Sequence, residues 1–202
     1  MSFANPTALK IGMTGALYGQ QFRVAGRSVM GVVVDGQTYY WNEFNIVNQQ
    51  NQSGTLVYEV TESGAEWKLF TLIEPKFPMT AQEAALKRVG DTVNLEGAPL
   101  PVTLVDSSRV YHIEGEGPEG EDVGDVAHYF NAQAGDQMLV ASWTGDDIEF
   151  YRGMELARGL VAEAFHLPQE PKEGLEETGG DSRLPPNVWV TMLLVIALIA
   201  IG

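Results

Sequence analysis

The sequence predicts a mainly β protein, in which an antiparallel meander forms a sandwich or partly closed barrels, accompanied by two short helices and a C-terminal transmembrane helix. Three observations indicate this fold. Glycine occurs 22 times in 202 residues, at the spacing of turns between short strands. The segments between these glycines are rich in β-branched and aromatic residues, as strands are. The last residues form an uncharged, apolar run.

Residues 1–75 predict about five antiparallel strands. The β-branched run Ser28 to Val34 ends at Asp35-Gly36, a dipeptide that strongly favours a two-residue hairpin turn. The run Thr38 to Val47 that follows is rich in aromatic residues. Residues 66–72 alternate between two faces, with Trp67 on one of them and Lys68 on the other. These patterns are typical of an antiparallel meander.

Two short helices are expected in the rest of the chain. Thr80-Ala81-Gln82-Glu83 has the pattern of a capping box and predicts a helix from Ala81 to Val89 that ends at Gly90. Residues 155–165 predict a second helix, which Gly159 weakens. Further strands are expected at residues 102–105, 109–114, 126–131, 137–143 and 148–151.

The composition divides the chain into three parts. Residues 1–167 are expected to form a β-rich soluble domain, and residues 168–187 an acidic linker rich in Pro and Gly. Residues 188–202 carry no charge and are interpreted as a transmembrane helix. Spanning a bilayer takes about 20 apolar residues, so this run is short. We therefore favour a membrane helix that continues beyond the chain over a short tail anchor, and both over a buried core helix.

Charge and composition limit the partners. The chain has 27 acidic and 12 basic residues, a net charge of −15, which argues against nucleic acid as a partner because phosphate contacts need clustered Lys and Arg. Such charge attracts basic proteins, polyamines or divalent cations. The N-terminus lacks the basic and apolar regions of a signal peptide, and the chain has no cysteine. We expect a single-pass protein of the cell inner membrane with its soluble domain in the cytoplasm.

Two motifs carry a resemblance to a known family. Trp41-Asn42-Glu43-Phe44 has the form W-x-E-[FY], and Ile148-Glu149-Phe150-Tyr151-Arg152-Gly153 has the form I-E-[FY]-Y-x-G. With Trp67 and Glu114-Gly115-Glu116 between them, these motifs resemble the bacterial domain of unknown function family 4178, over residues 11–167. The chain departs from the family at Ser142-Trp143, where an acidic residue is usual. The resemblance implies a β-rich domain, often membrane-associated, without an established activity.

Acidic residues supply the candidate sites. Trp41, Glu43 and Glu116 are the candidate binding residues. Glu43 lies within an aromatic strand, so its carboxylate must face solvent or find a donor; Arg23, Arg27 and Lys68 are the available cations. Hard cations bind clustered oxygen ligands, which makes one acidic segment a candidate calcium or magnesium site. Its ligands would be Glu116, Glu119, Glu121, Asp122 and Asp125. The spacing does not match an EF-hand, and a solvated acidic loop is the alternative.

No catalytic motif is recognisable. The sequence has no G-x-S-x-G, H-E-x-x-H or phosphate-binding glycine motif, and we expect no cofactor. The favoured hypothesis is a membrane-anchored, non-catalytic binding or scaffold domain whose partner is another protein or a cationic ligand. The alternative is a metal-assisted hydrolase, which requires the side chains of one set to converge. That set is Glu43, Glu116, His112 and His128. An extracytoplasmic lipoprotein-like domain is disfavoured by the missing signal and cysteine.

Overall fold

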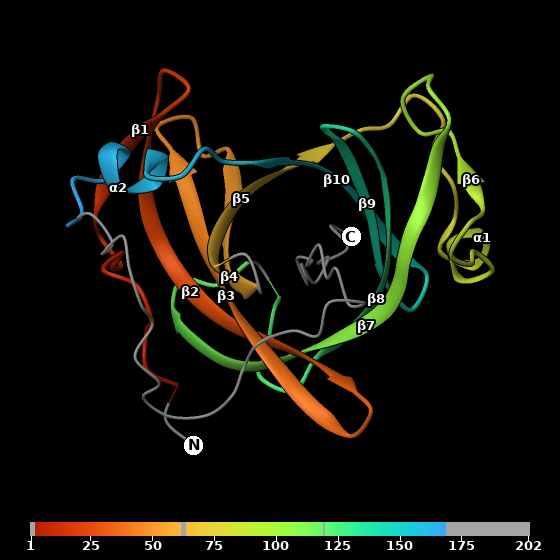
Figure 1. The fold of residues 1–202 in the computed structure, drawn as a ribbon, viewed down its shortest axis with the longest axis horizontal. Helices are drawn as coiled ribbons and strands as arrows, with labels where there is room; N and C mark the ends of the chain where they lie inside the picture. The colour runs from red at the N-terminus through yellow and green to blue at the C-terminus, as the bar shows by residue number, and fades with distance from the viewer. Residues whose placement is uncertain (1–2, 62–63, 119, 169–202) are drawn as a thin grey trace.

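Strands joined by turns build the first half of the sheet, because each pairs antiparallel with the strand that follows it. The computed structural model describes residues 3–61, 64–118 and 120–168, and Figure 1 shows its strands curving around a common axis. The five-stranded meander expected in residues 1–75 is confirmed. Its strands are β1 (Thr14–Leu17), β2 (Gln20–Val34), β3 (Gln37–Asn48), β4 (Ser53–Thr61) and β5 (Gly64–Ile73).

The second half adds a further meander. Its strands are β7 (Leu100–Gly115), β8 (Val126–Ala134), β9 (Gln137–Thr144) and β10 (Asp147–Glu155), and the short β6 (Thr92–Val93) pairs with the start of β7. The two strands expected at residues 102–105 and 109–114 are parts of the single long strand β7. A bulge between Val102 and Leu104 and another opposite Val29 and Met30 let this strand bend without breaking.

Two long-range pairings close the sheet. β10 pairs antiparallel with β5, and β7 pairs antiparallel with β2. The result is a closed barrel of eight strands in the order β2-β3-β4-β5-β10-β9-β8-β7. The expectation of a sandwich or partly closed barrels is therefore corrected to one closed barrel. Closure is possible because β2 and β7, at 15 and 16 residues, are long enough to bend and serve neighbours on both edges.

The hairpin turn expected at Asp35-Gly36 joins β2 to β3. Both residues have positive φ angles, 52° and 82°, as a two-residue turn of the primed type requires. Glycine adopts this conformation without a steric cost, and aspartate tolerates it better than most residues. The turn sets the register in which Val34 lies opposite Gln37.

The helices are shorter than expected. Thr80 caps α1 (Ala81–Ala85) with the predicted capping box, in which Glu83 reaches back to the Thr80 backbone. The helix ends at Ala85 rather than Val89. α2 (Leu160–Ala164) begins after Gly159, which has a φ of 84° and so cannot belong to a right-handed helix. The segment 155–159 that we expected to be helical instead ends β10 and forms a turn.

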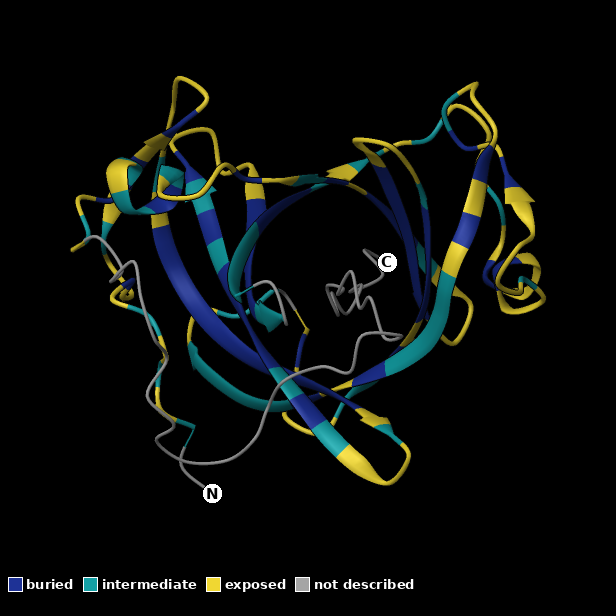
Figure 2. Cartoon of the chain, viewed as in Figure 1, coloured by how far each residue is buried: buried dark blue, intermediate teal, exposed yellow. Residues whose placement is uncertain are grey.

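Apolar side chains pack on both faces of the barrel wall. The inward face holds one cluster, which contains Met30, Trp41, Val57, Phe70 and Tyr129. Two further clusters lie on the outside of the wall. The first packs α1 and β6 against the outer faces of β8, β9 and β10, and the second packs α2 and Leu9 against those of β2, β3 and β4. Figure 2 shows the strands of the wall largely buried and the turns exposed.

Arg27 crosses the seam where β2 meets β7. Its guanidinium is almost fully buried and donates to Asn42 Oδ1 at 2.8 Å and Glu114 Oε1 at 2.9 Å. It also donates to the backbone carbonyls of Phe3 and Ala4, at 3.0 and 3.1 Å. A planar guanidinium has enough donors for all four contacts. Arg27 therefore joins the N-terminal segment, β3 and the closing pair of strands.

The predicted transmembrane helix, residues 188–202, and nearly all of the predicted linker lie outside the described residues. Within the described residues, no helix is long and apolar enough to cross a membrane. Membrane anchorage and the cytoplasmic orientation therefore stay predictions.

Candidate functional site

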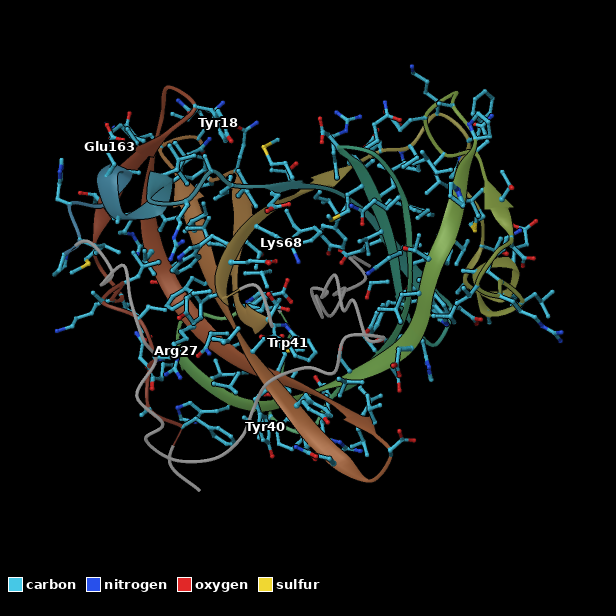
Figure 3. The ribbon with its side chains drawn as sticks, viewed as in Figure 1. Tyr18, Arg27, Tyr40, Trp41, Lys68 and Glu163 are labelled. Carbon is cyan, nitrogen blue, oxygen red and sulfur yellow. The ribbon has the colours of Figure 1, made fainter. Side chains whose placement is uncertain are left out.

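The inward face of the barrel carries polar side chains as well as its apolar cluster. Along each strand alternate residues face inward, so the odd residues of β3 and β4 and the even residues of β5 share this face. In Figure 3 Trp41 and Lys68 lie within the ring of strands, whereas Arg27 and Tyr40 lie outside it. We define the inward polar set by its members. They are Ser28, Glu43, Glu59, Lys68, Asp106, Ser108, Glu121, Tyr129, Glu149 and Tyr151.

Glu43 is the most deeply buried acid that the sequence singled out. Its side chain accepts a hydrogen bond of 2.7 Å from the Trp41 indole nitrogen, two residues earlier on the same face of β3. Burial raises the pKa of Glu43 well above its usual value, the Trp41 hydrogen bond opposes this, and the nearby charge of Glu121 adds to it. None of the three cations we considered as partners holds Glu43. The group that donates a hydrogen bond to Glu43 is the indole of Trp41.

Glu121 reaches the same region from the segment between β7 and β8. Ser28 donates a hydrogen bond of 2.7 Å to Glu121 Oε2. Ser28 is also the cross-strand neighbour of Glu43, so one serine adjoins both carboxyl groups. Burial raises the pKa of Glu121 to about 7, with the Ser28 hydrogen bond opposing the shift and Asp125 adding to it. Two acids from distant parts of the chain thus lie side by side in a water-poor setting.

A tyrosine and a third acid face this pair from β10. The Tyr151 hydroxyl donates a short hydrogen bond to Glu149, and burial raises the pKa of both groups. The charges of Glu43 and Glu121 also raise the pKa of Tyr151, which places all four groups within electrostatic reach of one another. Tyr129 of β8 is fully buried, and its pKa is raised by burial, then by Asp106 and Glu43.

Lys68 is a buried base on the inward face. Its ammonium contacts the Glu59 carboxylate directly and lies 3.8 Å from Glu66 Oε2. Burial lowers the pKa of Lys68 to about 8, and the charge of Glu155 partly offsets this. Lys68 is therefore engaged on β4 and β5, and Glu43, Glu121 and Glu149 are left without a described cationic partner.

Several buried oxygen atoms of this set have no hydrogen-bond partner among the described residues. They are Glu59 Oε2, Ser108 Oγ, Glu121 Oε1 and the Tyr129 hydroxyl. Leaving a buried polar atom unsatisfied costs roughly 1–3 kcal/mol, so native proteins keep few such atoms. Four such atoms lie on the inward wall of one barrel, and each of them has unused hydrogen-bonding capacity towards its interior.

The structure brings together only part of the predicted site. Trp41 and Glu43 are joined by their hydrogen bond, but Glu116 is exposed to solvent, and Arg23 Nη2 lies 3.2 Å from its carboxylate. Of the predicted metal ligands, Glu121 faces inward and Asp122 is exposed. Glu119 lies outside the described residues. Among the residues that are described, no group of three or more acidic or histidine side chains is arranged to hold a metal ion.

The two histidines of the hydrolase hypothesis lie apart from Glu43. His112 is on the outer face of β7, where its Nε2 is 3.1 Å from Glu114 Oε1 and its ring contacts Phe3. His128 is exposed on the outside of β8 and stacks on Trp143. The four side chains of that hypothesis therefore occupy different parts of the molecule, and the common pocket it requires is not formed by them.

Sequence reasoning missed most of the inward polar set. The sequence makes Glu121 a candidate metal ligand of an acidic segment, places Glu149 and Tyr151 only within the I-E-[FY]-Y-x-G motif, and gives Glu59 no role. One signal was present: Glu43, Glu59 and Glu149 each lie within an apolar strand, in phase with buried neighbours. Only closure of the barrel decides that the side chains of these three residues point into the same interior.

Comparisons with known proteins identify no relative. No family model matches the chain. Searches of curated proteins and of solved structures also found no match. The resemblance to family 4178 stays a prediction.

Proposed function

We propose that this chain is a membrane-anchored, non-catalytic binding domain that holds a small ligand on the inward face of its barrel. The observation that carries the proposal is the set of buried inward oxygen atoms without a described partner. A barrel of eight strands encloses a space that is filled either by side chains or by one small ligand. Small residues at inward positions, among them Ser28, Ser108 and Ala127, favour the second arrangement.

Neighbouring positions on β7 offer a matched test. Ser108 faces inward opposite Ala127, whereas Ser107 faces outward opposite His128. Ser108→Leu therefore adds three carbon atoms inside the barrel, and Ser107→Leu adds the same atoms outside. Both variants of the full-length chain are solubilised in detergent, incubated with cell extract filtered to retain only small molecules, and weighed by native mass spectrometry.

The proposal expects an added small-molecule mass on the wild type and on Ser107→Leu, and none on Ser108→Leu. Circular dichroism checks that each variant folds, and Ala127→Val replaces Ser108→Leu if the latter does not. An identical spectrum for all folded variants, with or without an added mass, contradicts binding on the inward face.

The membrane part of the proposal rests on residues 188–202, whose composition is that of a membrane helix. A tag at Met1 is tested for protease access in sealed inner-membrane vesicles of known orientation. Cleavage from the cytoplasmic side, together with resistance to carbonate extraction, is the expected result. If protease on the cytoplasmic side does not cleave the tag, the proposed orientation is wrong. If carbonate releases the protein from the membrane, the proposed membrane anchor is wrong.

A further inference from the structure

The charges on the inward face do not balance among the described residues. Glu43, Glu121 and Glu149 have no described cationic partner, and Lys68 already lies against Glu59 and Glu66. A buried carboxylate without a counter-charge is costly, and the cost is removed by protonation or by a cation. The face therefore has a place for positive charge that the described chain does not supply.

The geometry locates this place beside Ser28. Ser28 adjoins Glu43 across the β2–β3 pair and donates to Glu121 Oε2. Trp41 occupies Glu43 Oε1, while Glu121 Oε1 is buried and has no partner among the described residues. The carboxyl groups of Glu43 and Glu121 thus lie on either side of one serine, and one of their oxygen atoms is buried and unused. Together they can accept hydrogen bonds from a group that has several donors. A protonated amine is such a group.

Aromatic rings surround the same place. Trp41, Tyr129 and Tyr151 belong to the inward apolar cluster, and the Tyr129 hydroxyl is a further buried oxygen without a described partner. Aromatic rings attract cations through their faces, and they also cover the carbon atoms attached to an ammonium group. An organic amine fits this lining better than a hydrated metal ion, which needs six or more oxygen ligands or keeps its water.

We propose that the ligand of the inward face is a small organic amine, whose ammonium group lies between Glu43 and Glu121 with its carbon skeleton against the aromatic cluster. This inference rests on the proposed function, because it names the class of ligand for the same face.

A link between binding and protons follows. Burial keeps the carboxyl group of Glu121 protonated up to about pH 7, because its pKa is raised to about 7, and the pKa of Glu43 is raised as well. An ammonium group between them favours the ionised carboxylates, so binding releases protons and tightens as the pH rises towards 7. Other charged or titratable groups also face this pair from the neighbouring elements. They are Glu59 on β4, Lys68 on β5, Asp106 on β7, Tyr129 on β8, and Glu149 and Tyr151 on β10.

The test compares n-butylamine with n-butanol, which has a similar shape and no charge. Isothermal titration of the full-length chain in detergent measures both affinities at pH 7.5 and at pH 5.5, in two buffers that differ in ionisation enthalpy. The variants are Glu121→Gln and Glu43→Gln, which keep the side-chain shape. Glu163→Gln on α2 is the control, because it removes the same charge from the outside of the barrel.

The amine is expected to bind at least about tenfold more tightly than the alcohol. Its binding should release protons and should be weaker at pH 5.5 than at pH 7.5. Glu121→Gln or Glu43→Gln should weaken amine binding about tenfold, and Glu163→Gln should leave it unchanged. Equal binding of amine and alcohol contradicts the proposal, as does equal weakening by all three variants, which would indicate attraction to overall charge.

The mass measurement on the Ser107 and Ser108 variants distinguishes failure of the amine proposal from failure of ligand binding on the inward face. If a small molecule is retained on the inward face but the amine does not bind, the cationic ligand is wrong and the binding function stands. If Ser108→Leu retains the same small molecules as Ser107→Leu, or no protein retains any, both fail.

Discussion

The inward and outward faces of the barrel wall differ in what they bury. The two outer clusters are apolar and covered by α1, α2 and the N-terminal segment, so they resemble the core of an ordinary domain. The inward cluster borders acids, serines and tyrosines, some with buried oxygen atoms that no described group satisfies. The outer faces therefore bury almost only apolar groups, whereas the inward face also buries polar groups, and a buried polar atom without a partner lowers stability.

The largest expected effect comes from two adjacent residues of β9. Met138 belongs to the inward cluster and Leu139 to an outer one, and each is 5 % exposed. Truncating either side chain to Ala costs about 2–5 kcal/mol of unfolding free energy. We expect Leu139→Ala near the upper end, because nothing refills its apolar site, and Met138→Ala near the lower end, because polar neighbours admit water. Urea denaturation in detergent measures both, and a larger loss for Met138→Ala would break the comparison.

The seam between β2 and β7 is the next most sensitive feature. Arg27→Met removes four hydrogen bonds while keeping an apolar side chain of similar length. Because Glu114 is partly exposed and can be rehydrated, we expect a loss of about 2–3 kcal/mol. Glu114→Gln, which keeps an acceptor, should cost much less in the same urea titration. Equal losses would indicate that the charge of the pair, and not the hydrogen-bonded closure, stabilises the seam.

Acidity distinguishes the inward face from the outer ones. The pKa of Glu121 is raised to about 7 in the folded protein. As the pH increases, the Glu121 carboxyl group therefore ionises at a lower pH in the unfolded chain than in the folded protein. Stability should therefore fall between about pH 5 and about pH 7, by about 2 kcal/mol from this group. Glu121→Gln should flatten the decrease, and Glu163→Gln should not. Denaturation midpoints across this range measure the slope, and a wild-type slope unchanged by Glu121→Gln contradicts the burial argument.

The smallest expected effect lies at the edge of an outer cluster. Thr80→Ala removes the cap of α1, and caps of this type contribute about 1 kcal/mol. The inward face, where we propose that the amine binds, lies across the barrel wall from α1, so amine affinity should be unchanged while the denaturation midpoint falls. A change in affinity would show that α1 and the inward face are coupled, and would weaken the separation of roles between the two faces.

Local patterns predicted the local elements well. The hairpin at Asp35-Gly36 and the capping box at Thr80 were both found, because each depends on a few adjacent residues. The second helix was predicted too long, since Glu155 pairs at the end of β10 and the chain then turns at the left-handed Gly159 before the helix begins. The same local reasoning predicted separate strands at residues 102–105 and 109–114 and missed that both belong to the one strand β7.

The candidate site was predicted only in part. The hydrogen bond between Trp41 and Glu43 joins residues two apart on one strand face, a spacing that is visible in the chain. The contact between Ser28 and Glu121 joins residues 93 apart, and nothing in either segment indicates it. Acidic residues of the segment between β7 and β8 look alike in sequence, although Glu116 is exposed and pairs with Arg23, whereas Glu121 is buried against Ser28.

The sequence by itself determined the β-rich class, the meander, the turn chemistry and the acidic character, because these depend on residue type and on the two-residue period of strands. Only the tertiary structure decided that the sheet closes, through β5 with β10 and β2 with β7. Closure gives each strand one face towards a shared interior, and that interior turns scattered acids into neighbours. Pairing between strands so distant in the chain depends on the summed fit of many side chains, which no local pattern contains.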